Sequence, residues 1–92
     1  MPVLSDDEIE RRLDDLPEWR REGDSIKRQF KFGDFTGSID FVNRITPPAE
    51  EMNHHPDIAI SWNTVDLTLS THSEGGLTEN DFELAARIDS LA

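Results

Sequence analysis

The stretch EEMNHHPD, residues 50–57, marks the point where the chain changes from a helical to an extended period. Proline restricts the residue before it to extended conformations, so His55 is predicted to lie outside the preceding helix. Neighbouring side chains of an extended chain point to opposite sides, so His54 and His55 should face different ways. The third histidine, His72, lies in a later stretch. We expect the fold to bring the two stretches together.

Upstream of this stretch, the sequence predicts a helix, a hairpin and a second helix. Residues 5–16 place apolar side chains at helical spacing after a capping-box pattern. Residues 19–32 alternate on both sides of a glycine turn, which predicts two paired strands. From Phe35 the period is helical again. Proline inside a helix costs about 3 kcal/mol or more, so Pro47-Pro48 should end or kink this helix near Thr46.

Downstream, the sequence predicts a second hairpin and a last helix. Residues 57–62 and 65–71 alternate in polarity, with a tight turn predicted at Asn63-Thr64. Residues 78–91 have helical spacing, and Thr78-Glu79-Asn80-Asp81 resembles a capping box at the helix start. The resulting order is α-β-β-α-β-β-α. Because hairpins pair antiparallel, we predict an α+β fold with a four-stranded antiparallel sheet and helices packed on one face.

The length of 92 residues predicts a single domain over residues 1–92 with a thin core. Self-association is therefore expected. The chain has no cysteine, which excludes disulfides and thiolate metal sites. Its first residues lack the basic start and apolar run of a signal peptide, and no apolar run approaches the roughly 18 residues of a membrane helix. We therefore expect a soluble, cytoplasmic protein without membrane contact.

Charge argues against direct binding to nucleic acid. The chain has 20 acidic and 9 basic residues and a net charge of −11. Phosphate contacts need clustered lysine and arginine, which this composition does not supply. Only two of the basic residues are lysines. Such a surface suits either a high-salt cytoplasm or an ordinary acidic protein, and the sequence leaves both open.

The histidines are the candidate chemical groups. Imidazoles exchange protons near neutral pH, so His54, His55 and His72 are candidates for general acid or base catalysis. Two alternatives stay open: purely structural histidines, or a metal site with His54, His72 and Glu50 as its best ligands. Glu50 precedes His54 by four residues, so on a helix the two would share a face and form an ion pair.

Taken together, the motifs resemble those of the pterin-4a-carbinolamine dehydratases. The resemblance covers about residues 19–89, nearly the whole chain. It implies the same α-β-β-α-β-β-α fold and assembly into homodimers or homotetramers. The motifs that carry it are Phe30-Lys31-Phe32, Glu50, Asn53-His54-His55-Pro56-Asp57, Trp62-Asn63-Thr64-Val65, Leu69-Ser70-Thr71-His72, Gly75-Gly76-Leu77-Thr78 and Asp81.

The resemblance also implies a reaction, in which a 4a-hydroxytetrahydropterin loses water to give the quinonoid dihydropterin. By this resemblance His54 and His72 match the acid and base, and His55 matches a third active-site histidine. The acidic positions expected to bind the substrate or orient the histidines are Glu50, Asp57 and Asp81. Neither metal nor cofactor is implied. The pathway partner would be an aromatic amino-acid hydroxylase.

Departures from the family pattern leave substrate affinity and oligomeric state open. Ile58 replaces an aromatic residue of some members, Asn80 an arginine and Trp62 a common tyrosine, while Pro47-Pro48 interrupts a helix that runs smoothly in relatives. The family also suggests alternative functions. These are a role with pterins in molybdenum-cofactor metabolism, a non-catalytic module that binds a transcription factor as a dimerisation cofactor, or a catalytically silent fold.

Overall fold

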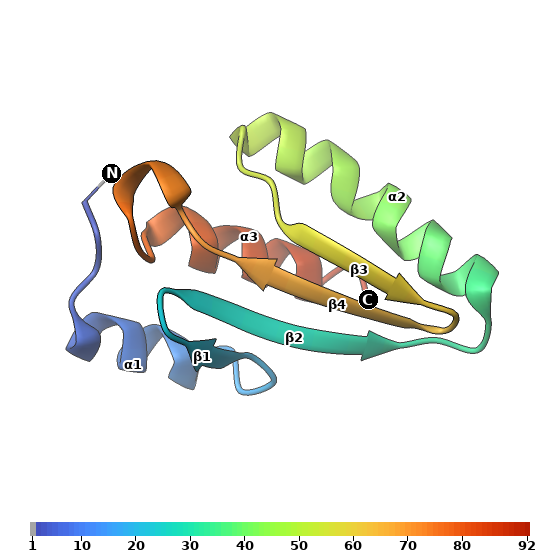
Figure 1. Cartoon of the computed structure of the whole chain (residues 1–92), viewed down its shortest axis with the longest axis horizontal. Helices are drawn as coiled ribbons and strands as arrows, with labels where there is room; N and C mark the ends of the chain where they lie inside the picture. Colours follow the sequence, from blue (N-terminus) through green and yellow to red (C-terminus); the bar gives the residue numbers. More distant parts are fainter. Residues whose placement is uncertain (1) are drawn as a thin grey trace.

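A computed structural model describes residues 2–92 of the chain (Figure 1). The predicted order of helices and strands is confirmed. The elements are α1 (Asp6–Asp14), β1 (Arg20–Glu22), β2 (Ser25–Lys31), α2 (Phe35–Met52), β3 (Asp57–Ser61), β4 (Thr64–Leu69), the 3-10 turn η1 (His72–Glu74) and α3 (Glu79–Asp89). The four strands form one antiparallel sheet in the order β1-β2-β4-β3.

The core lies on one face of the sheet, between the sheet and the helices. The alternating apolar residues of β2 and β4 form one cluster with residues of all three helices. The sheet and helix residues of this cluster include Ile26, Phe30, Val65, Leu67, Leu69, Ile9, Phe41, Ile45, Leu84 and Ile88. The opposite face is polar, and there Gln29 Nε2 donates to Asp66 Oδ1 at 2.9 Å. Figure 1 shows α3 behind the sheet and α2 along β3.

Helix α2 continues through Pro47-Pro48, so the predicted end or kink near Thr46 is wrong. The missing proline N–H groups leave the carbonyls of Asn43 and Arg44 without helical partners. Both residues are exposed, so water can satisfy these carbonyls. Burial of the apolar stripe on the other side offsets the local penalty, since the stripe crosses the prolines without interruption. It consists of Phe41, Ile45 and Ala49.

The second hairpin turns one residue earlier than predicted. Its two-residue loop is Trp62-Asn63 rather than Asn63-Thr64, because Thr64 already pairs with Ser61 in the ladder. Trp62 has a φ of 50°, the positive value that tight hairpin loops require at a central position. The side chain of Asn63 donates to the Phe32 carbonyl at 3.1 Å, which ties the loop to the end of β2.

Strand β3 is an edge strand and is exposed along its whole length. Ile58 and Ile60 pair with Leu67 and Val65, so they point toward the helix side of the sheet. They nevertheless remain 41% and 36% exposed, and Trp62 at the end of the hairpin is 67% exposed. The chain thus leaves apolar surface beside an unpaired strand edge. Within residues 2–92, no helix has the length and apolarity needed to cross a membrane.

Candidate active site

The end of α2 sets the direction of His54. Asn53 takes the left-handed conformation, with φ 49° and ψ 45°, and its N–H caps the last turn of the helix. The N–H of His54 then donates to the Ala49 carbonyl at 2.9 Å. This turn directs the imidazole inward, where His54 is only 9% exposed.

His54 contacts a buried carboxylate of α3. Its Nε2 lies 2.6 Å from Oδ1 of Asp81, and Asp81 is fully buried. The other oxygen, Oδ2, accepts hydrogen bonds from the hydroxyl of Thr71 at 2.8 Å and from the N–H of Thr78 at 2.9 Å. Asp81 therefore caps the start of α3, as the capping-box pattern predicted, and also holds His54.

One nitrogen of His54 stays available for chemistry. The contact with Asp81 uses Nε2, and no hydrogen bond of Nδ1 is seen within residues 2–92. No fully buried side-chain nitrogen or oxygen of those residues lacks a partner. Nδ1 therefore reaches the surface, through the small exposed fraction of the ring, and can exchange a proton there.

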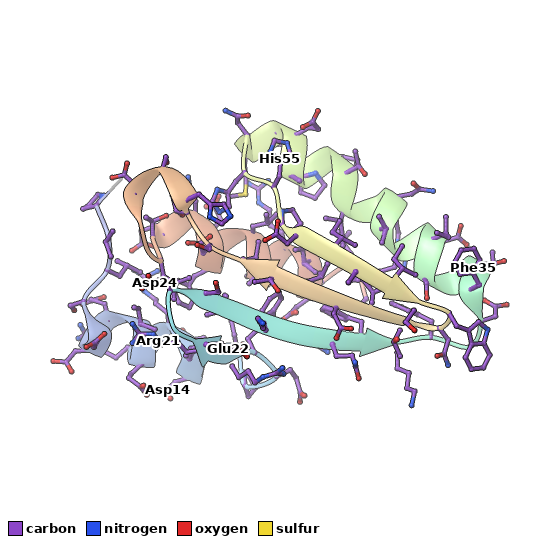
Figure 2. All side chains as sticks on the ribbon, in the orientation of Figure 1. Asp14, Arg21, Glu22, Asp24, Phe35 and His55 are labelled. Carbon is purple, nitrogen blue, oxygen red and sulfur yellow. The ribbon has the colours of Figure 1, made fainter. Side chains whose placement is uncertain are left out.

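His55 faces the other way, which confirms the prediction for neighbouring residues in an extended chain. It is exposed, and its Nε2 contacts the carboxylate of Glu50. Figure 2 shows His55 at the end of α2, where the chain enters β3. The expected ion pair of Glu50 with His54 is wrong. The helix ends at Met52, so His54 lies beyond it and the helical i, i+4 geometry does not apply.

His72 lies on η1, directly after β4, and is exposed. The preceding residue, Thr71, donates its hydroxyl to the carboxylate that contacts His54. Gly75, with a φ of 74°, closes the turn behind His72. The two histidine stretches are therefore brought together, through Thr71 and Asp81. That all three imidazoles line one cleft stays a prediction.

A hollow between α2 and β3 opens beside His55. Its volume is about 130 Å³, and its lining is mostly apolar, with Thr46, Glu50 and His55 as the polar residues. The apolar lining includes Val42, Ile45, Ala49, Pro56 and Ile58. A larger hollow of about 310 Å³ lies between α1 and α3 and contains no histidine. There Arg12 makes a bidentate contact with Glu79, and this hydrogen bonding raises the pKa of Arg12.

Comparison with known proteins gives a family. The sequence model for the family described as pterin 4 alpha carbinolamine dehydratase matches residues 2–91. The chain belongs to this dehydratase family. A relative from Mycobacteroides abscessus is 53% identical over 97% of this chain and 95% of its own length. A relative from Thermosynechococcus vestitus is 51% identical over 97% of this chain and 94% of its own length. Both carry the provisional name pterin-4-alpha-carbinolamine dehydratase.

Solved structures of dehydratase-like proteins share the fold. A protein of Brucella melitensis, described as a transcriptional coactivator/pterin dehydratase, superimposes with a TM-score of 0.94 at 36% identity over 98% of both chains. A pterin dehydratase-like protein described as a RuBisCO assembly factor of the alpha-carboxysome gives a TM-score of 0.70 at 29% identity. The match covers 82% of this chain and 89% of the other chain. Among these solved structures, one architecture therefore accompanies more than one described role.

Asp57 is the last of the acidic residues that were expected to bind the substrate. Asp57 is exposed at the start of β3, where its backbone pairs with Thr68. Within residues 2–92, no group of three or more histidine or acidic side chains has an arrangement that could hold a metal ion.

Reasoning from the sequence missed Thr71 as a partner of Asp81. The available signal was its place immediately before His72 at the end of an alternating strand.

Proposed function

We propose that this chain catalyses the dehydration of a 4a-hydroxytetrahydropterin, with His54 as the central proton-transfer group. The observation that carries the proposal is the buried contact of His54 with Asp81, which occupies Nε2 and leaves Nδ1 toward the surface. The family relationship supplies the reaction, and relatives about 50% identical over nearly the whole chain support it.

The reaction needs one proton delivered and one removed. Hydroxide is a poor leaving group from C4a, so an imidazolium protonates the oxygen as the C–O bond breaks and water leaves. A base removes the proton from the neighbouring ring nitrogen, whose electron pair forms the new C=N bond. Positioned groups of this kind contribute roughly 10²–10⁴-fold each. We assign these two steps to His54 and His72 without fixing which is the acid.

The hollow beside His55 suits one edge of a flat pterin, and His54 and His72, which do not line it, would act on the part of the ring outside it. Its apolar lining, which includes Pro56 and Ile58, offers contact to a ring face, while its polar lining includes Glu50 and His55. A carboxylate accepts hydrogen bonds from amide and amino groups such as those along the pterin edge. We therefore assign substrate binding to Glu50 and His55, with exposed Asp57 beside them.

The proposed role of Asp81 differs from direct substrate binding. Its side chain is fully buried, and both oxygens are already engaged by groups of the protein, namely His54, Thr71 and Thr78. Asp81 is therefore proposed to orient His54 and to balance its charge when it is protonated.

The experiment generates the 4a-hydroxypterin with an aromatic amino-acid hydroxylase and follows its loss by ultraviolet absorbance. We expect the purified chain to accelerate this loss well above the rate in buffer. A rate equal to that in buffer would refute the dehydratase and leave the non-catalytic alternatives, such as an assembly factor of the kind described for the carboxysome protein. The hydroxylase pathway and the cytoplasmic location predicted from the sequence would be tested by co-expression and cell fractionation.

The partner proposed for the exposed edge is a second copy of the chain. Strand β3 has one unpaired edge, and Ile58, Ile60 and Trp62 leave apolar surface beside it. Exposed apolar edges tend to associate, and a core this small gains stability from assembly. We propose that two copies pair along β3 to form a homodimer, from which a homotetramer could also be built.

A further inference from the structure

Two threonine hydroxyls lie behind the His54–Asp81 pair. Thr71 is only 9% exposed and Thr78 is fully buried. The hydroxyl of Thr71 donates to Oδ2 of Asp81 at 2.8 Å, and the two threonine hydroxyl oxygens lie 2.8 Å apart. A hydroxyl carries a single proton, so Thr78 must be the donor to Thr71. The hydrogen bonds therefore run in one direction, from Thr78 through Thr71 to Asp81.

These hydrogen bonds limit where the proton between His54 and Asp81 can lie. Oδ2 of Asp81 accepts two donors, the Thr71 hydroxyl and the Thr78 N–H, so it has no place for a proton of its own. Carboxyl groups are stronger acids than imidazolium ions, and two donors to Oδ2 further favour the ionised carboxylate. The proton between Oδ1 and Nε2 of His54, which lie 2.6 Å apart, is therefore assigned to Nε2. A neutral His54 held in this way carries its proton on Nε2 and presents a bare Nδ1.

Thr71 also anchors the turn that carries His72. Its backbone carbonyl accepts the N–H of Glu74 at 3.0 Å and that of Gly75 at 3.0 Å, and its N–H donates to the Gly76 carbonyl at 3.1 Å. Thr71 therefore fixes the start of η1 through its backbone and the tautomer of His54 through its side chain. Within residues 2–92, three residues hydrogen-bond to the side chain of Asp81, and of these only Thr71 also bonds to the backbone of the turn.

We infer that Thr71 is a positioning residue of the dehydratase. It fixes the tautomer of His54 and the position of His72 relative to His54. This inference deepens the proposed function and rests on it. The Thr71 hydroxyl is engaged by Thr78 and Asp81, so we expect its effect to pass through Asp81 and not through contact with the substrate. Its loss should therefore lower the rate of proton transfer more than it weakens substrate binding.

The kinetic test replaces Thr71 with valine, which keeps the shape and removes the hydroxyl. We expect Thr71→Val to lower kcat roughly 10–100-fold, as small misplacements of catalytic groups do, with KM changed less than about twofold. Thr71→Ser should restore most of kcat. The control Thr64→Val also removes a hydroxyl bond from β4, to the Ser61 carbonyl at 2.9 Å, and should leave kcat unchanged.

A second measurement does not depend on activity. In protein labelled with ¹⁵N-histidine, we expect wild-type His54 to carry its proton on Nε2 and to show a slowly exchanging imidazole signal, which Thr71→Val loses. A wild-type spectrum with Nδ1 protonated and Nε2 bare would overturn the inference, even if Thr71→Val fails to fold. A folded Thr71→Val that keeps both kcat and the signal would also overturn it. If the wild type lacks dehydratase activity, the spectrum still decides the tautomer.

Discussion

Nε2 of His54 lies 2.6 Å from Oδ1 of Asp81, although the two residues are 27 positions apart in the chain. His54 follows the end of α2 and Asp81 lies in the first turn of α3. One carboxylate therefore caps a helix and orients the imidazole that we assign to proton transfer. Fold and chemistry depend on the same side chain.

Asp81→Asn should lower both the stability of the fold and the rate of the reaction. The amide cannot accept on both sides, so at least one of the contacts to His54, Thr71 and Thr78 is lost. We expect stability to fall by about 1–3 kcal/mol, as for other unsatisfied buried groups, and kcat to fall roughly 10²–10⁴-fold. Urea unfolding and the pterin assay measure the two effects.

The matched control for this substitution is Asp89→Asn. Asp89 is also an acid of α3, and its carboxylate accepts from Trp19 Nε1 at 2.9 Å and from Arg28 Nη1 at 2.8 Å. We expect Asp89→Asn to lower stability while kcat stays near the wild-type value. An equal loss of kcat in both variants would mean that Asp81 acts only through stability.

Glu50→Gln should mainly weaken substrate binding. The Glu50 and His55 side chains are exposed, so their pair adds less than about 1 kcal/mol to stability. Loss of the carboxylate from the polar lining of the hollow should raise KM with a smaller change in kcat. Glu51→Gln is the control, since it neutralises the adjacent residue, whose contact is with Arg87. Equal KM values in the two variants would remove Glu50 from the proposed binding site.

Most of the fold was predictable from the sequence because its signals are local. Alternation and capping patterns identified the order of helices and strands, and Pro56 indicated that His54 and His55 face different ways. The partner of each histidine was not predictable. Glu50 pairs with His55 because α2 ends at Met52, and the contact of Asp81 depends on how α3 packs against the rest of the domain.

Two errors have the same physical origin. The sequence assigned a break at Pro47-Pro48 from a local penalty, but the buried stripe of α2 keeps the helix intact. The hairpin loop was placed one residue late because a positive φ at Trp62 is unusual for a tryptophan. In both places contacts distant in the sequence override a local preference. At the prolines these are the contacts of the buried stripe, and at the hairpin they are the pairing of Thr64 with Lys31 and the bond from Asn63 to Phe32.

Removal of the prolines should stabilise α2. In the double variant Pro47→Ala with Pro48→Ala, two helical hydrogen bonds to the carbonyls of Asn43 and Arg44 become available. Alanine also gives the unfolded chain more entropy, which offsets part of this effect. We therefore expect the free energy of unfolding to rise by about 1–3 kcal/mol. Thermal unfolding followed by circular dichroism measures it. A lower melting temperature would show that the prolines support the packing of the helix.

Ile60→Lys should prevent assembly without unfolding the domain. Ile60 is 36% exposed on the edge strand β3, and a charge there is a common obstacle to strand pairing. We expect light scattering to give a larger mass for the wild type than for this variant, at equal helix content. Lys31→Glu is the control, since Lys31 is exposed on β2, away from that edge. An unchanged mass in Ile60→Lys would place the interface elsewhere.

The most direct test of the central claim compares single-turnover loss of the 4a-hydroxypterin in wild type and in His54→Ala, with the folded state of both confirmed by circular dichroism. We predict that wild type accelerates the loss and that His54→Ala retains about 1% of that acceleration or less, the share expected when a positioned acid or base is removed. A folded His54→Ala that matches wild type would contradict the assignment of proton transfer to the buried histidine.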